Sequence, residues 1–139
     1  MNLDRFGFKA KNKRTGLWEC ACLNMFNFGC YGVTWDISET ESYYYSDIYP
    51  ETLCQCTGMK DSYGNLIYEN DYLHVKGMYK GEPVECEKAL VKYDEAMLTW
   101  LVRLDDHSEY LKNILRQGVG AWECVVVGNK FDKEKENEP

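Results

Sequence analysis

Apolar and polar residues alternate along much of this chain with a period of two, which is typical of β-strands that are buried on one face. Between residues 17 and 23, Trp18, Cys20 and Cys22 fall on one face and Leu17, Ala21 and Leu23 on the other, so this strand is expected to be covered on both faces. We predict strands at 5–10, 17–23, 33–37, 43–49, 53–57, 71–76, 84–93, 96–104 and 121–129. The chain is therefore expected to be mainly β.

Two pairs of these runs are separated by short polar turns and are predicted to be hairpins. The first turn is 11–16, rich in Lys, Asn and Gly, and the second is Asp94-Glu95. In the second strand of the later hairpin, 96–104, one of the two sets of alternate residues is more apolar and is expected to face the core. This set is Leu98, Trp100, Val102 and Leu104.

Only the segment 108–117 has apolar residues at the helical spacing of three and four. These residues are Tyr110, Leu111, Ile114 and Leu115. A polar side chain is expected to cap the start of this helix, the candidates being Asp105, Asp106 and Ser108. The predicted fold class is thus β-rich α+β with one short helix.

The net charge of the chain and the distribution of its charged residues bear on whether it binds nucleic acid. The 139 residues carry 16 Lys and Arg against 23 Asp and Glu, a formal net charge of −7, which disfavours a broad basic face for duplex nucleic acid. The basic residues nevertheless gather at the first hairpin, whereas 36–71 has eight acids and only one lysine. Lys9, Lys11, Lys13 and Arg14 are therefore kept as candidate nucleic-acid contacts, with a solvated turn as the simpler interpretation.

The seven cysteines include two Cys-x-Cys pairs, Cys20/Cys22 and Cys54/Cys56. Zinc knuckles space their cysteines by two to four residues around a tight turn, whereas these pairs fall in strand-like runs. Buried packing is the preferred interpretation, and we expect neither a metal nor a cofactor. An odd number of cysteines with no signal-peptide pattern and no membrane-spanning apolar stretch predicts a cytoplasmic protein.

Tyrosine is abundant, and part of it is clustered just before residue 50. Tyr43, Tyr44, Tyr45 and Tyr49 are candidates for a protein interface or for plain packing. Acidic neighbours make the stacking of single-stranded bases a weaker alternative.

A turn-rich motif at residues 55–71 resembles the signature of the YopX-like family, small proteins of phages and prophages. The matching residues are Gln55, Thr57, Gly58, Asp61, Gly64, Ile67, Tyr68, Glu69 and Asp71. A second match, at Gly128 and Asn129, resembles the end of the family pattern. Asn70 stands where the family usually has Gly, and Asn is the best non-Gly residue for a left-handed conformation.

The resemblance implies an N-terminal β-hairpin or meander part, 1–57, joined to a small SH3-like barrel, 58–131, with a frayed charged tail at 132–139. It also implies a phage or prophage origin and makes homo-oligomers plausible, but it implies no enzymatic activity. In physical terms the motif is structural, since Gly58 and Gly64 permit tight turns and Asp61 can accept backbone N–H groups.

We therefore expect a non-enzymatic cytoplasmic binding protein that associates with itself and contacts a host or phage protein. Two rivals remain open. One is a nucleic-acid-binding accessory protein that uses the basic hairpin. The other is an enzyme that uses Asp61, Glu69, Asp71 and His74, which requires these groups to converge in a cleft.

Overall fold

The computed structural model describes residues 7–25, 31–34, 45–46, 48–116 and 122–132. The chain divides into two compact units, Met1–Met59 and Lys60–Pro139. No helix among these described residues is long and apolar enough to cross a membrane. Both units are built from antiparallel strands, so the prediction of a mainly β chain is confirmed.

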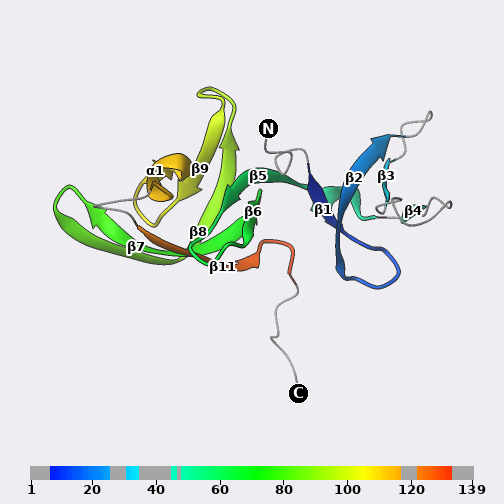
Figure 1. The fold of residues 1–139 in the computed structure, drawn as a ribbon, viewed down its shortest axis with the longest axis horizontal. Coiled ribbons are helices and arrows are strands. Elements are labelled where there is room, and N and C mark those ends of the chain that lie inside the picture. The colour runs from blue at the N-terminus through cyan, green and yellow to red at the C-terminus, as the bar shows by residue number, and fades with distance from the viewer. Residues whose placement is uncertain (1–6, 26–30, 35–44, 47, 117–121, 133–139) are drawn as a thin grey trace, which may run out of the picture. The chain divides into compact units, whose positions relative to one another are not determined.

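The first unit is an antiparallel sheet in which the strands follow the order β4-β3-β2-β1-β5 (Figure 1). The strands are β1 (Phe8–Lys11), β2 (Trp18–Met25), β3 (Tyr31–Thr34), β4 (Tyr45–Ser46) and β5 (Cys54–Lys60), with a 3-10 turn at Pro50–Thr52. Lys9 lies opposite Cys20 on one side and Cys54 on the other, so β1 is a central strand. Ala10 and Ile48 form a small buried core, against which Leu53 packs.

The turn between β1 and β2 is organised by the buried side chain of Asn12. Its Oδ1 accepts hydrogen bonds from the backbone N–H groups of Arg14 (2.7 Å) and Thr15 (3.1 Å), and its Nδ2 donates to Glu19 (2.9 Å). Such a side-chain bond to nearby backbone is the usual reason for Asn in a turn. The polar 11–16 segment is therefore an ordered hairpin turn, as its sequence predicts.

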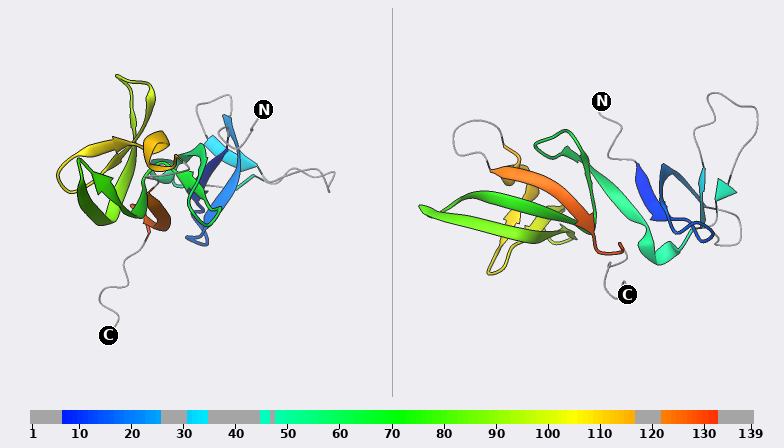
Figure 2. Two further views of the ribbon diagram at one scale, coloured as in Figure 1. Left: turned by 60° about the vertical axis from the view of Figure 1, so that its left-hand side comes forward. Right: turned by 90° about the horizontal axis from the view of Figure 1, so that it is seen from below.

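The second unit contains a five-stranded sheet in the order β10-β9-β8-β7-β11, which curls into a half-barrel (Figures 1 and 2). The strands of this sheet are β7 (Asp71–Tyr79), β8 (Glu82–Asp94), β9 (Thr99–Arg103), β10 (Ser108–Tyr110) and β11 (Glu123–Asn129). The unit also contains α1 (Leu111–Ile114) and β6 (Leu66–Tyr68), which is not a strand of this sheet. The pairing shifts register between Leu73 and Val75 and again between Val126 and Gly128. Such irregularities bend strands and increase their twist, which suits the curl.

Alternate residues of the long strands point into the curl and are buried. Fully buried core residues of this unit are Ile67, Leu73, Val75, Ala89, Val91, Val102, Leu111 and Cys124. Helix α1 lies on the concave side and buries Leu111 and Ile114 (Figure 1). At about 25 cal/mol per Å² of apolar surface, this packing is the main source of the unit's stability.

Two sequence predictions about the helix are wrong. The segment Ser108–Tyr110 is not helical but pairs with β9, and only Leu111–Ile114 is α-helix within the described residues. Its N-cap is Tyr110 with no side-chain hydrogen bond, so neither Asp105, Asp106 nor Ser108 caps it. Pairing with β9 satisfies the backbone groups that a longer helix would have bonded internally.

The predicted strand 96–104 begins only at Thr99, because the turn before it includes Leu98. Leu98 therefore does not belong to the core face, although Val102 and Leu104 do. Strand β6 was not predicted, since only three residues carry its pattern.

Candidate functional site

The turn that follows β5 is organised by the carboxylate of Asp61. Its Oδ1 accepts hydrogen bonds from the backbone N–H groups of Tyr63 and Asn65, both at 2.9 Å. Gly64 has a φ of 86°, the left-handed conformation that favours glycine. Asp61 thus has the turn-forming role that the motif predicts.

Asp61 and its neighbour Ser62 also bind a strand that is distant in the sequence. Asp61 Oδ2 accepts the backbone N–H of Val126 at 2.9 Å. The backbone N–H of Ser62 donates to the carbonyl of Cys124 (2.8 Å), and the N–H of Cys124 donates to the Ser62 hydroxyl (3.0 Å). Because β11 is an edge strand of its sheet, this turn covers backbone groups that would otherwise face outward.

The ionised form of Asp61 is the form that the fold binds. Burial raises the pKa of the Asp61 carboxyl, but the hydrogen bonds from Val126, Asn65 and Tyr63 outweigh the burial and hold its pKa below the ordinary value of 3.8. Such a group is suited to holding backbone in place, because it stays charged at neutral pH.

Asp71, at the start of β7, is fully buried and joins the 55–71 motif to the second sequence match at Gly128 and Asn129. Its Oδ2 accepts the backbone N–H of Tyr68 (2.8 Å), and its Oδ1 accepts the side-chain amide of Asn129 (2.8 Å). The same amide lies 3.4 Å from the carbonyl of Glu69, and Asn129 Oδ1 accepts the N–H of Phe131 at 2.9 Å. The two separate sequence matches therefore meet in space.

Asn70 adopts a φ of 68°, which confirms the expected left-handed conformation at this position. Its backbone N–H donates to the carbonyl of Val91 (2.9 Å), and its carbonyl accepts the N–H of Lys130 (2.8 Å). Its side chain accepts a hydrogen bond from Lys92 Nζ at 2.9 Å. We call the residues joined in this way the clasp: Asp61, Ser62, Asn70, Asp71, Cys124, Val126 and Asn129.

The remaining motif residues have local packing or turn roles. Ile67 is fully buried, and the Thr57 hydroxyl accepts the backbone N–H of Met59 at 3.1 Å. Gly58 has a φ of 79°, and Gly128 lies at the register shift of β11. Gln55 is an exposed residue of β5.

A hollow of about 220 Å³ lies beside the clasp. Its lining residues are Tyr72, Lys88, Val127, Gly128, Asn129, Lys130 and Asp132. Asp132 accepts the backbone N–H of Asn129 at 2.9 Å, so part of this lining serves the clasp itself.

The four residues of the enzyme hypothesis do not form one catalytic group in the described contacts. Asp61 and Asp71 accept hydrogen bonds from backbone and amide groups, as above. His74 Nε2 lies 2.7 Å from Glu85 Oε2 on a partly exposed face, and the hydrogen bond from His74 lowers the pKa of Glu85. Glu69 contributes its carbonyl oxygen to Asn129.

The cysteines with described side chains are buried and outside disulfides. They are Cys54, Cys56, Cys86 and Cys124. Burial raises the pKa of Cys124 to about 12, and burial also raises the pKa of Cys86, whose Sγ lies 3.8 Å from Asp105 Oδ1. Thiols of this kind are poor nucleophiles. Among the residues that the structure describes, no group of three or more His, Cys, Asp or Glu side chains could hold a metal ion.

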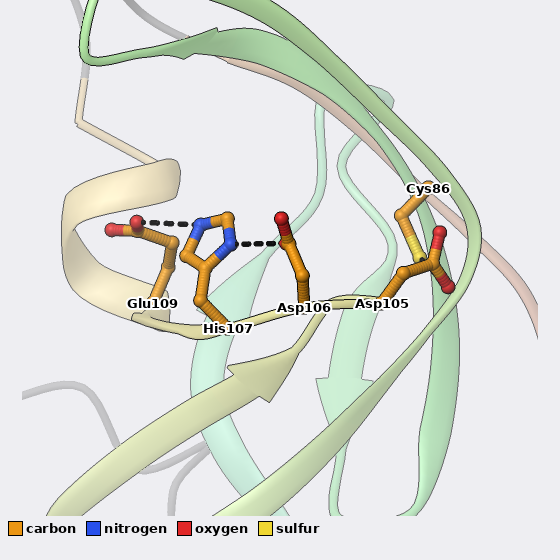
Figure 3. Close-up of polar contacts among 5 residues, drawn as sticks. All are labelled: Cys86, Asp105, Asp106, His107 and Glu109. Carbon is orange, nitrogen blue, oxygen red and sulfur yellow. Dashed lines mark hydrogen bonds and ion pairs between the residues drawn. The ribbon is translucent and has the colours of Figure 1, made fainter.

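His107 lies between two carboxylates (Figure 3). Its Nδ1 is 2.6 Å from Asp106 Oδ1, and its Nε2 is 3.0 Å from Glu109 Oε2 in an ion-pair contact. The ring stacks on Tyr79 with 4.1 Å between centroids, and its side chain is only 17% exposed. The hydrogen bond from His107 lowers the pKa of Asp106. His107 therefore connects the β9–β10 turn to β7.

The first hairpin presents its basic residues in two different ways. Lys9 Nζ and Lys11 Nζ lie over the ring of Trp18, at 4.7 and 5.2 Å from its centroid, in cation–π geometry. Lys13 and Arg14 are exposed in the turn, and Leu17 beside them is 67% exposed. We call Lys13, Arg14 and Leu17 the basic tip.

Most of the tyrosines of the predicted interface have no side chain among those that the structure describes. Tyr43 and Tyr44 lie outside the described residues, and Tyr45 is described only as a backbone position of β4. Tyr49 is an exposed residue.

The β8–β9 hairpin carries an apolar feature that the sequence reasoning missed. Met97 is 60% exposed and Leu98 is 75% exposed, and Leu98 has a φ of 53°. A left-handed conformation costs a residue such as Leu about 1 kcal/mol. Asp94 accepts the N–H of Ala96 at 3.1 Å and shapes the turn, and Glu95 is exposed. We call Asp94, Glu95, Met97 and Leu98 the acidic tip.

Below this tip the hairpin is stiffened by its aromatic residues. The rings of Tyr93 and Trp100 contact edge to face, with 5.0 Å between centroids, and the two residues are direct cross-strand partners. The only sequence signal for the tip was the dipeptide Met97-Leu98, one residue after the acids Asp94 and Glu95, and this dipeptide was predicted to lie in a strand.

These features define a mainly β protein of two antiparallel sheets, in which two distant sequence motifs are joined by buried polar contacts. The family model described as YopX protein matches residues 10–135, and the chain belongs to the YopX family. Searches of curated proteins and of solved structures found no match.

Proposed function

We propose that this chain is a non-enzymatic binding protein of phage or prophage origin that works in the bacterial cytoplasm. It associates with itself and contacts a host or phage protein. The second unit is proposed to follow the plan of a small SH3-like barrel, for which the curled sheet is suitable support at the level of fold class.

The observation that carries the proposal is the acidic tip. Met97 and Leu98 are turned to solvent, and Leu98 holds a conformation that is unfavourable for its residue type. Backbone strain combined with an exposed apolar side chain is typical of positions kept for contact with a partner. The acids of the clasp, in contrast, are occupied by structural hydrogen bonds.

Light scattering over a range of protein concentrations tests self-association. We expect the mean mass of the wild type to rise with concentration, and Met97→Ser to reduce this rise. Met78→Ser is the matched control, because Met78 is a similarly exposed methionine (56%) of β7, outside the acidic tip. A monomer at every concentration contradicts the self-association.

The nucleic-acid alternative is favoured by one observation, the basic side chains Lys9 and Lys11 over the ring of Trp18. It predicts binding to a labelled single-stranded oligonucleotide, measured by fluorescence anisotropy, which weakens steeply as salt increases. Changing all four basic residues, Lys9, Lys11, Lys13 and Arg14, to Ala or Glu would abolish that binding. Absence of binding at low salt would exclude this alternative.

A further inference from the structure

The two hairpin tips that stand out on the units have opposite charge. The acidic tip carries Asp94 and Glu95 next to Met97 and Leu98, and the basic tip carries Lys13 and Arg14 next to Leu17. Each tip therefore combines exposed charge of one sign with an exposed aliphatic side chain. This combination is what complementary protein surfaces share.

We propose that the acidic tip of one copy docks on the basic tip of a second copy. This inference rests on the self-association in the proposed function and names the surfaces that produce it. In the contact, Glu95 faces the basic pair Lys13 and Arg14, while Leu98 and Met97 cover Leu17. The aliphatic contact provides attraction, and the charges select the partner and its orientation.

The ordered geometry of both tips supports the proposal. The basic tip is fixed by the hydrogen bonds of Asn12 to the backbone N–H groups of Arg14 and Thr15. The acidic tip is fixed by the bond from Ala96 to Asp94 and by the Tyr93–Trp100 contact beneath it. Surfaces that are ordered before binding lose less conformational entropy when they associate.

Two hairpin tips bury less surface than the roughly 1,200 Å² of a stable interface, so the association should be weak and dependent on concentration. Because the ion pairs are exposed, salt should weaken it further. The contact joins two different patches of the same chain, so it is heterologous. Such contacts build either closed rings or extended chains of copies.

Mixing two charge-reversed variants tests the proposal. The first variant is Glu95→Lys, and the second is the double variant Lys13→Glu with Arg14→Glu. Each variant alone should associate about tenfold more weakly than the wild type, because every tip contact then brings like charges together. The equimolar mixture should associate more strongly than either variant, because one pairing of tips is again complementary. Sedimentation velocity at low salt measures all three samples.

The matched control pair is Glu87→Lys and Arg116→Glu, which reverses exposed charges away from both tips. This pair should associate like the wild type, alone and mixed. Association of both tip variants at the wild-type level would overturn the proposal, as would a mixture no stronger than its components.

The outcomes separate this inference from the proposed function. If the wild type associates but charge reversal at the tips changes nothing, the tip contact is wrong and self-association stands. If the wild type is a monomer at all concentrations, both fail. If the mixture fails to recover and only the basic-tip variant loses oligonucleotide binding, the basic tip serves nucleic acid and the proposal is overturned.

Discussion

In the clasp, the carboxylates of Asp61 and Asp71 are taken up by hydrogen bonds to backbone and amide groups, whereas Met97 and Leu98 in the acidic tip are turned to solvent. Both regions belong to the second unit, and both contain a non-glycine residue with positive φ. In the clasp, Asn70 uses that conformation to make three hydrogen bonds. At the tip, Leu98 uses it to hold an apolar side chain outward.

The difference teaches that a family signature need not mark the site of action. Three of the residues that carry the family signature, Asp61, Asp71 and Asn129, join distant segments of the fold, because few residue types can bond buried backbone and amide groups in those positions. A contact surface for a particular partner has no such restriction, and so it leaves a weaker pattern in the sequence.

The largest effect on the stability of the clasp is expected from a substitution of Asp71. Asp71→Ala removes the fully buried acceptor of the Tyr68 N–H and of the Asn129 amide, and so breaks the contact between β7 and the end of β11. We expect the free energy of unfolding to fall by about 3 kcal/mol, measured by urea denaturation. The exposed Glu87→Ala should change it by less than about 0.5 kcal/mol. An equal effect of both substitutions would show that the clasp contributes little to stability.

A second large effect is expected outside the signature. A Cβ at Gly77 of β7 would lie 2.1 Å from the Trp122 ring, so Gly77→Ala forces this ring to move. The expected loss of unfolding free energy is about 2 kcal/mol. Combining it with Trp122→Leu should cost less than the sum of the two single changes. Additive losses would mean that the ring does not press on Gly77.

A smaller effect, dependent on pH, is expected at Asp61. Because its folded pKa lies below 3.8, its charge stabilises the fold above pH 3.8, and this contribution is lost as pH falls through the folded pKa. Asp61→Asn should lower the unfolding free energy by about 1–2 kcal/mol at pH 7, and by progressively less below pH 3.8. The exposed Glu85→Gln serves as the control and should show a smaller pH-dependent change. A constant difference across the pH range would contradict the role of the charge.

The smallest effect has the opposite sign. Leu98→Asn relieves the left-handed strain, and we expect the unfolding free energy to rise by up to about 1 kcal/mol while self-association weakens. Met97→Asn should weaken association without the gain in stability, since Met97 is not among the positions with positive φ. Loss of stability in Leu98→Asn would mean that the tip contributes to the fold.

Strand periodicity and turn chemistry were enough to predict the β-rich class and the two hairpins, and the family resemblance was enough to predict the conformation of Asn70. They failed where tertiary pairing overrides local preference. Ser108–Tyr110 has helical spacing yet pairs with β9, and Leu98 has strand alternation yet lies in a turn. The hydrogen bond between Asp71 and Asn129 could not be predicted either, because a single sequence shows both motifs but not that they are in contact.

The covering of the β11 edge by Asp61 and Ser62 has a consequence for how the chain is made. The Val126 N–H reaches a carboxylate 65 positions earlier, whereas the hairpin bonds of β7, β8 and β9 are local. On the ribosome those hairpins can therefore form first, and β11 emerges after every other described strand. Until it does, β7 offers an unpaired edge to other nascent chains. Closing so long a loop also costs more chain entropy than forming a hairpin. Docking of β11 should therefore be a late step in the folding of the second unit.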